Sequence, residues 1–316
     1  MNIFPKKQEE TGREKVIIVE NVSNKYNDEF FLKNISFVVY KGEIFSIIGL
    51  SGSGKSTLLK TIVGLEKKLG GTISVLGNNI FFTRKMVGFS PQQDSFFSDL
   101  SISQNMELFS SMNGVSYKTG KELGKEYLKM LGMEGFDEKK PKELSGGQKK
   151  RLNIILSCLH SPKLLILDEP FAALDYYNRR ILWDFLISLK NRGITIVLTT
   201  HLLNEAQEYS SRVLVLKNGK KFGYGTFNEI KEKIGFNYLL HIKMSHVANS
   251  FIDSLTHFCM LKKIRIVYNL KKELLFAVAG GEDKSTIEGF MKRNNQEFTE
   301  VEFRPPNLDE VILASR

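Results

Sequence analysis

Three short apolar runs in the chain are each followed by polar residues, and this pattern predicts buried strands that end at a ligand site. The runs are residues 43–48 (EIFSII), 164–167 (LLIL) and 195–198 (TIVL). Apolar runs of this length are typical of parallel strands that are covered on both faces. Because open α/β sheets bind ligands beyond the carboxyl ends of their strands, we expect the residues after these runs to form a site.

The region between the first and second runs has a helical pattern instead. Residues 94–112 and 121–131 are predicted helices, and they form a helical subdomain of about residues 94–145. At its start, Phe96 and Phe97 could pack into the core of this subdomain. Exposed aromatic residues could equally form a docking groove for a partner helix.

The chain after the third run predicts a hairpin and then a small separate domain. Asn218-Gly219 is typical of a tight turn between two strands, and residues 226–234 predict a closing helix with a Thr cap. The domain starts at Gly235. Its predicted elements are strands 238–243, 263–268, 274–278 and 298–303 with helices 247–257 and 286–293. This βαββαβ order is that of a ferredoxin-like α+β domain.

Residues 49–57 (GLSGSGKST), the phosphate loop, follow the first apolar run at once and match G-x-x-x-x-G-K-[ST]. A helical pattern over residues 56–63 comes next, so the motif has the strand and helix context that it needs. Glycines let backbone N–H groups turn towards a β-phosphate, and the helix N-terminus adds donors. Lys55 would contact the β- and γ-phosphates, and the Ser56 hydroxyl is a hard ligand for Mg²⁺. The loop predicts nucleotide binding.

Asp168 and Glu169 follow the second apolar run. An acidic turn after a strand is common in isolation, but Mg²⁺ needs a carboxylate contact besides the Ser56 hydroxyl. Glu169 would then polarise a water molecule that attacks the γ-phosphate. The two carboxylates therefore predict a hydrolase.

The signature segment, residues 144–148 (LSGGQ), lies between the phosphate loop and the acidic strand end. A Ser and two Gly at the start of a helix form a second anion-binding N-terminus. The segment could simply cap its helix, but its place in the chain favours a role in the same site. One chain would then hold two phosphate sites and one lysine loop. In two chains arranged head to tail, each signature segment would close on the γ-phosphate held by the phosphate loop of the partner chain.

With these motifs, residues 16–233 resemble the ATP-binding subunits of ABC transporters. Four more residues occupy positions that this family uses. The resemblance implies that Tyr26 stacks on adenine, although a strand-end tyrosine is also often structural. It implies that Gln92 touches Mg²⁺ and signals to a membrane subunit, that Asp175 lies in a loop crossing between subunits, and that His201 contacts the γ-phosphate.

The resemblance implies an α/β fold, in which a P-loop ATPase core with a mixed sheet, flanking helices and a helical subdomain precedes the small C-terminal domain. Its expected catalytic residues are Glu169, His201, Lys55 and Gln92, and its expected Mg²⁺ ligands are Ser56, Gln92 and Asp168. The expected ATP-binding residues are Tyr26, Gly49, Leu50, Ser51, Gly52, Ser53, Gly54, Lys55, Ser56, Thr57, Ser145, Gly146, Gly147, Gln148 and Asp175.

The resemblance also implies partners: a second ATPase subunit, giving a homodimer, and an integral membrane permease. Residues 305–312 (PPNLDEVI) are similar to the ending of C-terminal extensions in bacterial and archaeal exporter ATPases, which implies export. The alternative is a cytosolic ABC ATPase of translation, DNA repair or assembly. The chain has one ATPase core and no long heptad tract, and this favours the transporter.

Length and composition agree with this interpretation. A chain of 316 residues suits a disordered tail (1–15), an ATPase domain (16–234) and a small domain (235–316). No apolar run approaches about 18 residues and residues 1–15 lack a signal peptide, so we expect a cytoplasmic protein, peripheral on the inner face of the cell membrane. The net charge of +10 is scattered lysine without interleaved aromatics, so no specific nucleic acid is expected.

Overall fold

The computed structural model describes residues 12–26, 29–234, 236–245, 249–270, 272–307 and 310. They form two compact units, which divide between Tyr224 and Gly225. The sequence placed this boundary ten residues later, after α8 (Phe227–Ile234), but this helix groups with the second unit. Of the predicted N-terminal tail, residues 1–11 lie outside the described residues, and Lys15 already opens the first strand.

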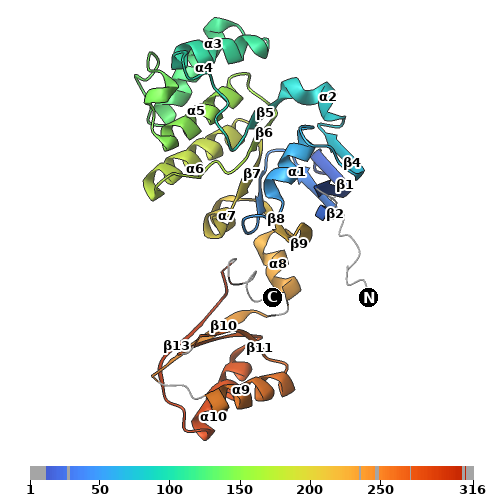
Figure 1. The fold of residues 1–316 in the computed structure, drawn as a ribbon, viewed down its shortest axis with the longest axis vertical. Coiled ribbons are helices and arrows are strands. Elements are labelled where there is room, and N and C mark those ends of the chain that lie inside the picture. Colours follow the sequence, from blue (N-terminus) through green and yellow to red (C-terminus); the bar gives the residue numbers. More distant parts are fainter. Residues whose placement is uncertain are drawn as a thin grey trace. The chain divides into compact units, whose positions relative to one another are not determined.

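The first unit is built on a six-stranded sheet with the order β5-β6-β7-β3-β8-β9 (Figure 1). These strands are β3 (Ile44–Ile48), β5 (Val87–Ser90), β6 (Leu164–Leu167), β7 (Thr195–Thr200), β8 (Arg212–Lys217) and β9 (Lys220–Gly225). Strands β5, β6, β7, β3 and β8 pair in parallel. The three apolar runs are thus the adjacent strands β6, β7 and β3, and their carboxyl ends meet at one edge, as predicted.

Alternate residues of these strands enter two different cores. Leu165 and Leu167 pack into a cluster with the helical residues of the unit. Leu164 and Ile166 pack instead against α1 (Lys55–Ile62) and a second sheet. Because both faces are covered, the strands are continuous apolar runs rather than alternating ones.

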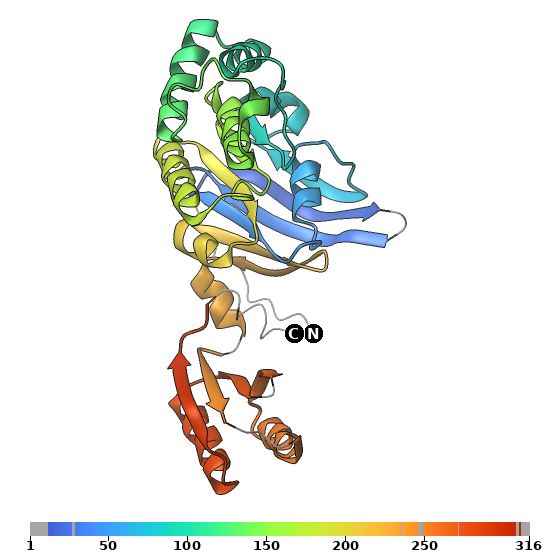
Figure 2. The ribbon, with the colours of Figure 1, turned by 60° about the vertical axis from the view of Figure 1, so that its left-hand side comes forward.

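The second sheet is antiparallel, with the order β2-β1-β4, and the sequence analysis did not identify two of its strands. Its strands are β1 (Lys15–Tyr26), β2 (Glu29–Tyr40) and β4 (Gly70–Val75). The small helix α2 (Ile80–Thr83) and a helical turn (Arg84–Met86) follow β4. In Figure 2 the hairpin of β1 and β2 extends away from the helices α3 and α4.

The helical subdomain contains α3 (Ile102–Met112), α4 (Tyr117–Met130) and the start of α5 (Gly146–Cys158). The predicted helix 94–112 was wrong in its first eight residues. The Asn105 side chain accepts a hydrogen bond from Phe97 N and donates to the carbonyls of Phe97, Leu100 and Ser101. This contact holds the segment before α3 in a non-helical form. The described part of this unit also contains a helical turn (Pro141–Glu143) before the signature segment and the helices α6 (Tyr176–Asn191) and α7 (Leu203–Tyr209).

The second unit has the predicted βαββαβ order after α8. Its elements are β10 (Tyr238–Met244), α9 (Asn249–Leu261), β11 (Arg265–Leu270), β12 (Glu273–Val278), α10 (Gly281–Arg293) and β13 (Phe298–Arg304). The sheet is antiparallel with the order β11-β12-β10-β13. The pattern of residues 305–313 also predicts a final helix capped by Asn307, and there Asn307 and Glu310 exchange the hydrogen bonds of a capping box. Its remaining residues, 308–309 and 311–313, lie outside the described residues.

Candidate functional site

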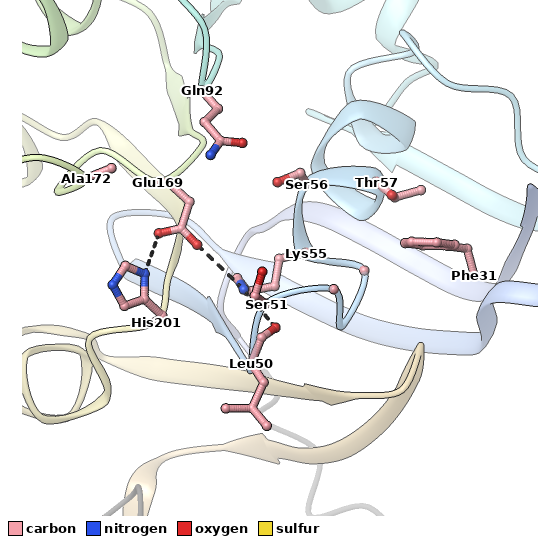
Figure 3. A pocket seen from close by; sticks show the side chains of 12 residues that line it. Phe31, Leu50, Ser51, Lys55, Ser56, Thr57, Gln92, Glu169, Ala172 and His201 are labelled. Atoms are coloured by element: carbon pink, nitrogen blue, oxygen red, sulfur yellow. Dashed lines mark hydrogen bonds and ion pairs between the residues drawn. The ribbon is translucent and has the colours of Figure 1, made fainter. Parts of the chain in front are cut away.

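A pocket of about 590 Å³ lies at the carboxyl edge of the parallel strands (Figure 3). It brings together residues that are far apart in the sequence. Its lining residues are Phe31, Leu50, Ser51, Gly52, Gly54, Lys55, Ser56, Thr57, Gln92, Glu169, Ala172 and His201. All four residues predicted to be catalytic are among them, and these come from α1, from the segment after β5, and from the ends of β6 and β7.

Backbone geometry fixes the phosphate loop between β3 and α1. Gly49 has a φ of 155°, and a Cβ atom there would lie 2.3 Å from the carbonyl oxygen of Leu216. Gly54, the N-cap of α1, has a φ of 100°, which favours glycine. The Lys55 side chain folds back over the loop, and its Nζ donates to Gly49 O at 2.9 Å and Leu50 O at 3.2 Å. These two contacts hold the Lys55 ammonium group at the phosphate loop.

Asp168 is 1% exposed and organises the strand ends around it. Its Oδ1 accepts hydrogen bonds from Ser56 Oγ at 2.9 Å and from Thr199 Oγ1 at 2.6 Å. Thr199 Oγ1 also accepts a hydrogen bond from the Glu169 backbone N–H at 2.8 Å. The Thr199 hydroxyl thus ties the end of β7 to the Asp168 carboxylate and to the backbone of Glu169, a role that the sequence analysis did not assign to it.

Glu169 stands between a cation and an imidazole. Its Oε1 lies 3.6 Å from Lys55 Nζ, and its Oε2 lies 3.0 Å from His201 Nδ1 (Figure 3). The Glu169 backbone has a φ of 49°, which is uncommon for a non-glycine residue and turns the side chain into the pocket. The Glu169 side chain is 12% exposed, whereas that of His201 is 60% exposed. A molecule entering the pocket would therefore meet His201 and Glu169 together.

The pocket differs from the prediction in its aromatic residue. Phe31, on β2, lines the pocket and is 39% exposed. The predicted aromatic, Tyr26, lies at the end of β1, but its side chain is outside what the structure describes. The sequence carried no signal for Phe31, because a lone aromatic residue on a strand is most often a packing residue.

The signature segment and Asp175 do not line this pocket. Ser145 caps α5: its Oγ accepts from Gln148 N, and the Gln148 side chain accepts from Ser145 N at 2.9 Å. Asp175 caps α6, and hydrogen bonds from the backbone and side chain of Asn178 lower the pKa of its carboxyl group. Each residue completes a local helix cap, and neither contributes to the pocket around the phosphate loop of its own chain.

Known proteins show the same organisation. The family model described as "ABC transporter" matches residues 32–172. An uncharacterized ABC transporter ATP-binding protein of Methanocaldococcus jannaschii is 34% identical over 220 residues, which cover 70% of this chain and 81% of that protein. The chain belongs to the ABC transporter ATP-binding proteins.

Two further relatives of this ABC protein bear on its function. The Nod factor export ATP-binding protein I of Burkholderia orbicola is 35% identical over 209 residues, covering 65% of this chain and 69% of that protein. A bacterial ABC transporter cassette, solved as a dimer, has a TM-score of 0.61 at 30% identity and covers 66% of this chain and 98% of its own. The chain therefore has the fold of a P-loop ABC ATPase, and it is an ATP-hydrolysing subunit of an ABC transporter.

Proposed function

We propose that this ABC protein energises export through a separate membrane permease, as a head-to-tail dimer that closes on two Mg²⁺·ATP. The observation that carries the proposal is the arrangement of Lys55, Glu169 and His201 around one pocket. The relatives described above are transporter proteins, and this favours the transporter over a cytosolic ABC ATPase. We place the protein in the cytoplasm, against the inner face of the cell membrane. None of the described helices combines the length and apolar character needed to cross a bilayer.

ATP would enter with its β- and γ-phosphates over the phosphate loop. Backbone N–H groups and the α1 N-terminus would cradle the phosphates, and Lys55 would exchange its loop carbonyl partners for phosphate oxygens. The exposed ring of Phe31 offers an apolar surface on the same wall of the pocket. We assign it, with Tyr26, to the nucleoside end of ATP.

The residues beside the phosphate loop fit Mg²⁺. The Ser56 hydroxyl and the Asp168 carboxylate are hard oxygen donors in contact with each other, and the Gln92 side chain faces the same space (Figure 3). Mg²⁺ takes few protein ligands and keeps oxygen contacts to phosphate and water. When bound there, it would neutralise charge on the transferred phosphate. The Asp168 carboxylate would then exchange its hydrogen bond from Ser56 for a contact with Mg²⁺.

Glu169 is the proposed general base. Its carboxylate faces the pocket and is held by His201 on one side, so it would orient a water molecule for attack on the γ-phosphate. Its contact with Lys55 spans 3.6 Å, which is longer than a hydrogen bond, so phosphate can take over this cation. His201, being exposed, would reach the γ-phosphate from the same side.

The dimer explains the signature segment. Ser145, Gly146 and Gly147 lie at a helix N-terminus outside the pocket, where a second molecule could accept hydrogen bonds from the Ser145 hydroxyl and the glycine N–H groups. The dimeric cassette among the structural relatives supports this arrangement. Each signature segment would close on the γ-phosphate held by the partner chain, and Asp175 would lie at the crossing.

The permease would dock beside the glutamine loop, which we define as residues 91–95. The two aromatics after it have different environments: Phe96 packs against the core cluster, whereas Phe97 is 53% exposed. Phe97 is therefore the docking candidate, and Phe96 is a core residue. Export is supported by the Nod factor export relative and by the ending at residues 305–312.

The test is a pull-down from detergent-solubilised membranes with the Glu169→Gln variant and ATP. A polytopic membrane protein should co-purify, and Lys55→Ala should recover much less of it. In the Glu169→Gln background, Phe97→Ser should lower the recovery, whereas Met260→Ser, which removes a still more exposed apolar side chain in the second unit, should not. Recovery of only ribosomes or DNA-repair subunits would overturn the transporter assignment.

A further inference from the structure

Lys150 carries a charge that the proposed chemistry does not use. It lies in the first turns of α5 and is 6% exposed. Its Nζ donates to three backbone carbonyl oxygens: Pro91 O at 3.2 Å, Gln92 O at 3.0 Å and Asp168 O at 3.2 Å. An ammonium group has three donors, so all of them are used.

The three acceptors belong to the two segments that hold the proposed Mg²⁺ ligands. Pro91 and Gln92 begin the glutamine loop, and Asp168 directly follows β6. The contacts are to backbone oxygens, so they leave the Gln92 side chain free to line the pocket and the Asp168 carboxylate free to accept from Ser56. Lys150 therefore joins two segments of the site without entering it.

Burying this ammonium group is unfavourable. Burial lowers the pKa of Lys150, and the carboxylates of Asp168, Asp94 and Glu169 only partly oppose this effect. An apolar side chain of similar length would fill the space without such a desolvation cost. The three hydrogen bonds to carbonyl oxygens are the favourable interactions that offset this desolvation cost.

Asn153 continues the same face of α5 one turn later. Its Nδ2 donates to Gln93 O at 3.1 Å, and its Oδ1 accepts from Ser95 N at 3.0 Å and Ser95 Oγ at 3.1 Å. Lys150 and Asn153 together bind the backbone of four of the five residues of the glutamine loop, namely Pro91, Gln92, Gln93 and Ser95. The helix that begins at the signature segment thus holds this loop in register.

We propose that Lys150 is a positioning residue: it fixes the glutamine loop against the end of β6 and so sets the separation of the Gln92 and Asp168 side chains. The inference rests on the proposed function, in which these two side chains serve Mg²⁺ and phosphate. A movement of α5, which begins only four residues earlier at Gly146, would pass to Gln92 through Lys150.

The test compares Lys150→Met with the neighbouring control Lys149→Met in the full-length chain. Lys150→Met should lower kcat by about tenfold or more, because small displacements of site groups are costly. ATP affinity without Mg²⁺, set by the phosphate loop, should stay within about twofold. The gain in ATP affinity on adding Mg²⁺, measured with a fluorescent ATP analogue, should shrink. Lys150→Gln, which keeps two donors, should restore part of this gain, and Lys149→Met should match the wild type.

Several outcomes would overturn the positioning role. Wild-type kcat and Mg²⁺ dependence in Lys150→Met would do so, and so would loss of Mg²⁺-free ATP binding or of the fold in both Lys150 variants. Glu169→Gln in the same assay tests the proposed function separately. Full turnover in that variant would contradict the proposed function, whereas a Mg²⁺ effect of Lys150→Met in the binding assay would still support the positioning role.

Discussion

The two regions that we propose to contact phosphate, the phosphate loop and the signature segment, are built in opposite ways. Around the phosphate loop, Lys55 and Asp168 are 6% and 1% exposed, and each is held by several hydrogen bonds. In the signature segment, Ser145 and Gly146 are exposed and bonded only within their own helix cap. The first region is organised by the interior of its own chain. The second presents a helix end to something outside.

This difference separates binding from turnover. A buried, pre-formed set of donors can bind ATP in a single chain, because its groups need no reordering. An exposed helix N-terminus has a weak field in water and becomes effective only when a partner excludes solvent. Changes in the phosphate loop should therefore weaken binding, and changes in the signature segment should affect only the closed dimer.

The largest effect is expected from Glu169→Gln. Losing the general base should lower kcat by about 10² to 10⁴-fold while ATP binding is kept, because the amide cannot accept the proton of the attacking water. Single-turnover hydrolysis and an ATP titration measure the two quantities. Glu66→Gln, an exposed position after α1, is the control. Turnover near the wild-type value would remove Glu169 from its proposed role.

Lys55→Ala tests the phosphate-loop region directly. Two charge-assisted contacts to phosphate, each of about 1.5 kcal/mol, correspond to about a hundredfold loss of ATP affinity. Isothermal titration measures the Kd. Lys60→Ala, in the last turn of the same helix, should bind ATP normally. Unchanged affinity in Lys55→Ala would contradict the assignment of the phosphate loop.

Ser145→Ala tests the signature segment. It removes one hydroxyl contact to phosphate, so turnover should fall by about tenfold with no change in ATP affinity. Mixing it with Lys55→Ala chains gives the decisive measurement. A mixed head-to-tail dimer contains one site with both halves intact, so the mixture should hydrolyse ATP faster than either variant alone. If mixing restores no ATP hydrolysis, the phosphate loop of one chain and the signature segment of the other do not meet across a dimer.

Much of the site could be predicted because its determinants are local. The strand before the phosphate loop was expected at 43–48 and is β3 at Ile44–Ile48. Thr226 caps α8 as expected, with its Oγ1 accepting from Glu229 N. Apolar runs, glycine loops and caps act over a few residues, so they can be recognised in the sequence.

The rest depends on contacts between distant residues. α3 begins at Ile102 rather than near residue 94 because Asn105 and Asn153 hold the intervening backbone, and neither contact has a local signature. Phe31 lines the pocket only because the hairpin of β1 and β2 places it there. Lys150 resembled one of several surface lysines, and only the packing of α5 shows it to be buried.

The smallest predicted effect concerns Lys150, which links the two halves. Burial lowers its pKa in the folded state from the ordinary 10.5. Between that lowered value and about 10.5, the unfolded chain binds the proton more tightly, so stability rises with pH across this window. Relative to Lys150→Met, the wild type should gain stability as the pH rises towards 10.5. Urea denaturation of both proteins measures this difference. If the stability difference between wild type and Lys150→Met stays constant with pH, the Lys150 ammonium group is not desolvated. The phosphate-loop region would then lack its buried link to α5, the helix that begins at the signature segment.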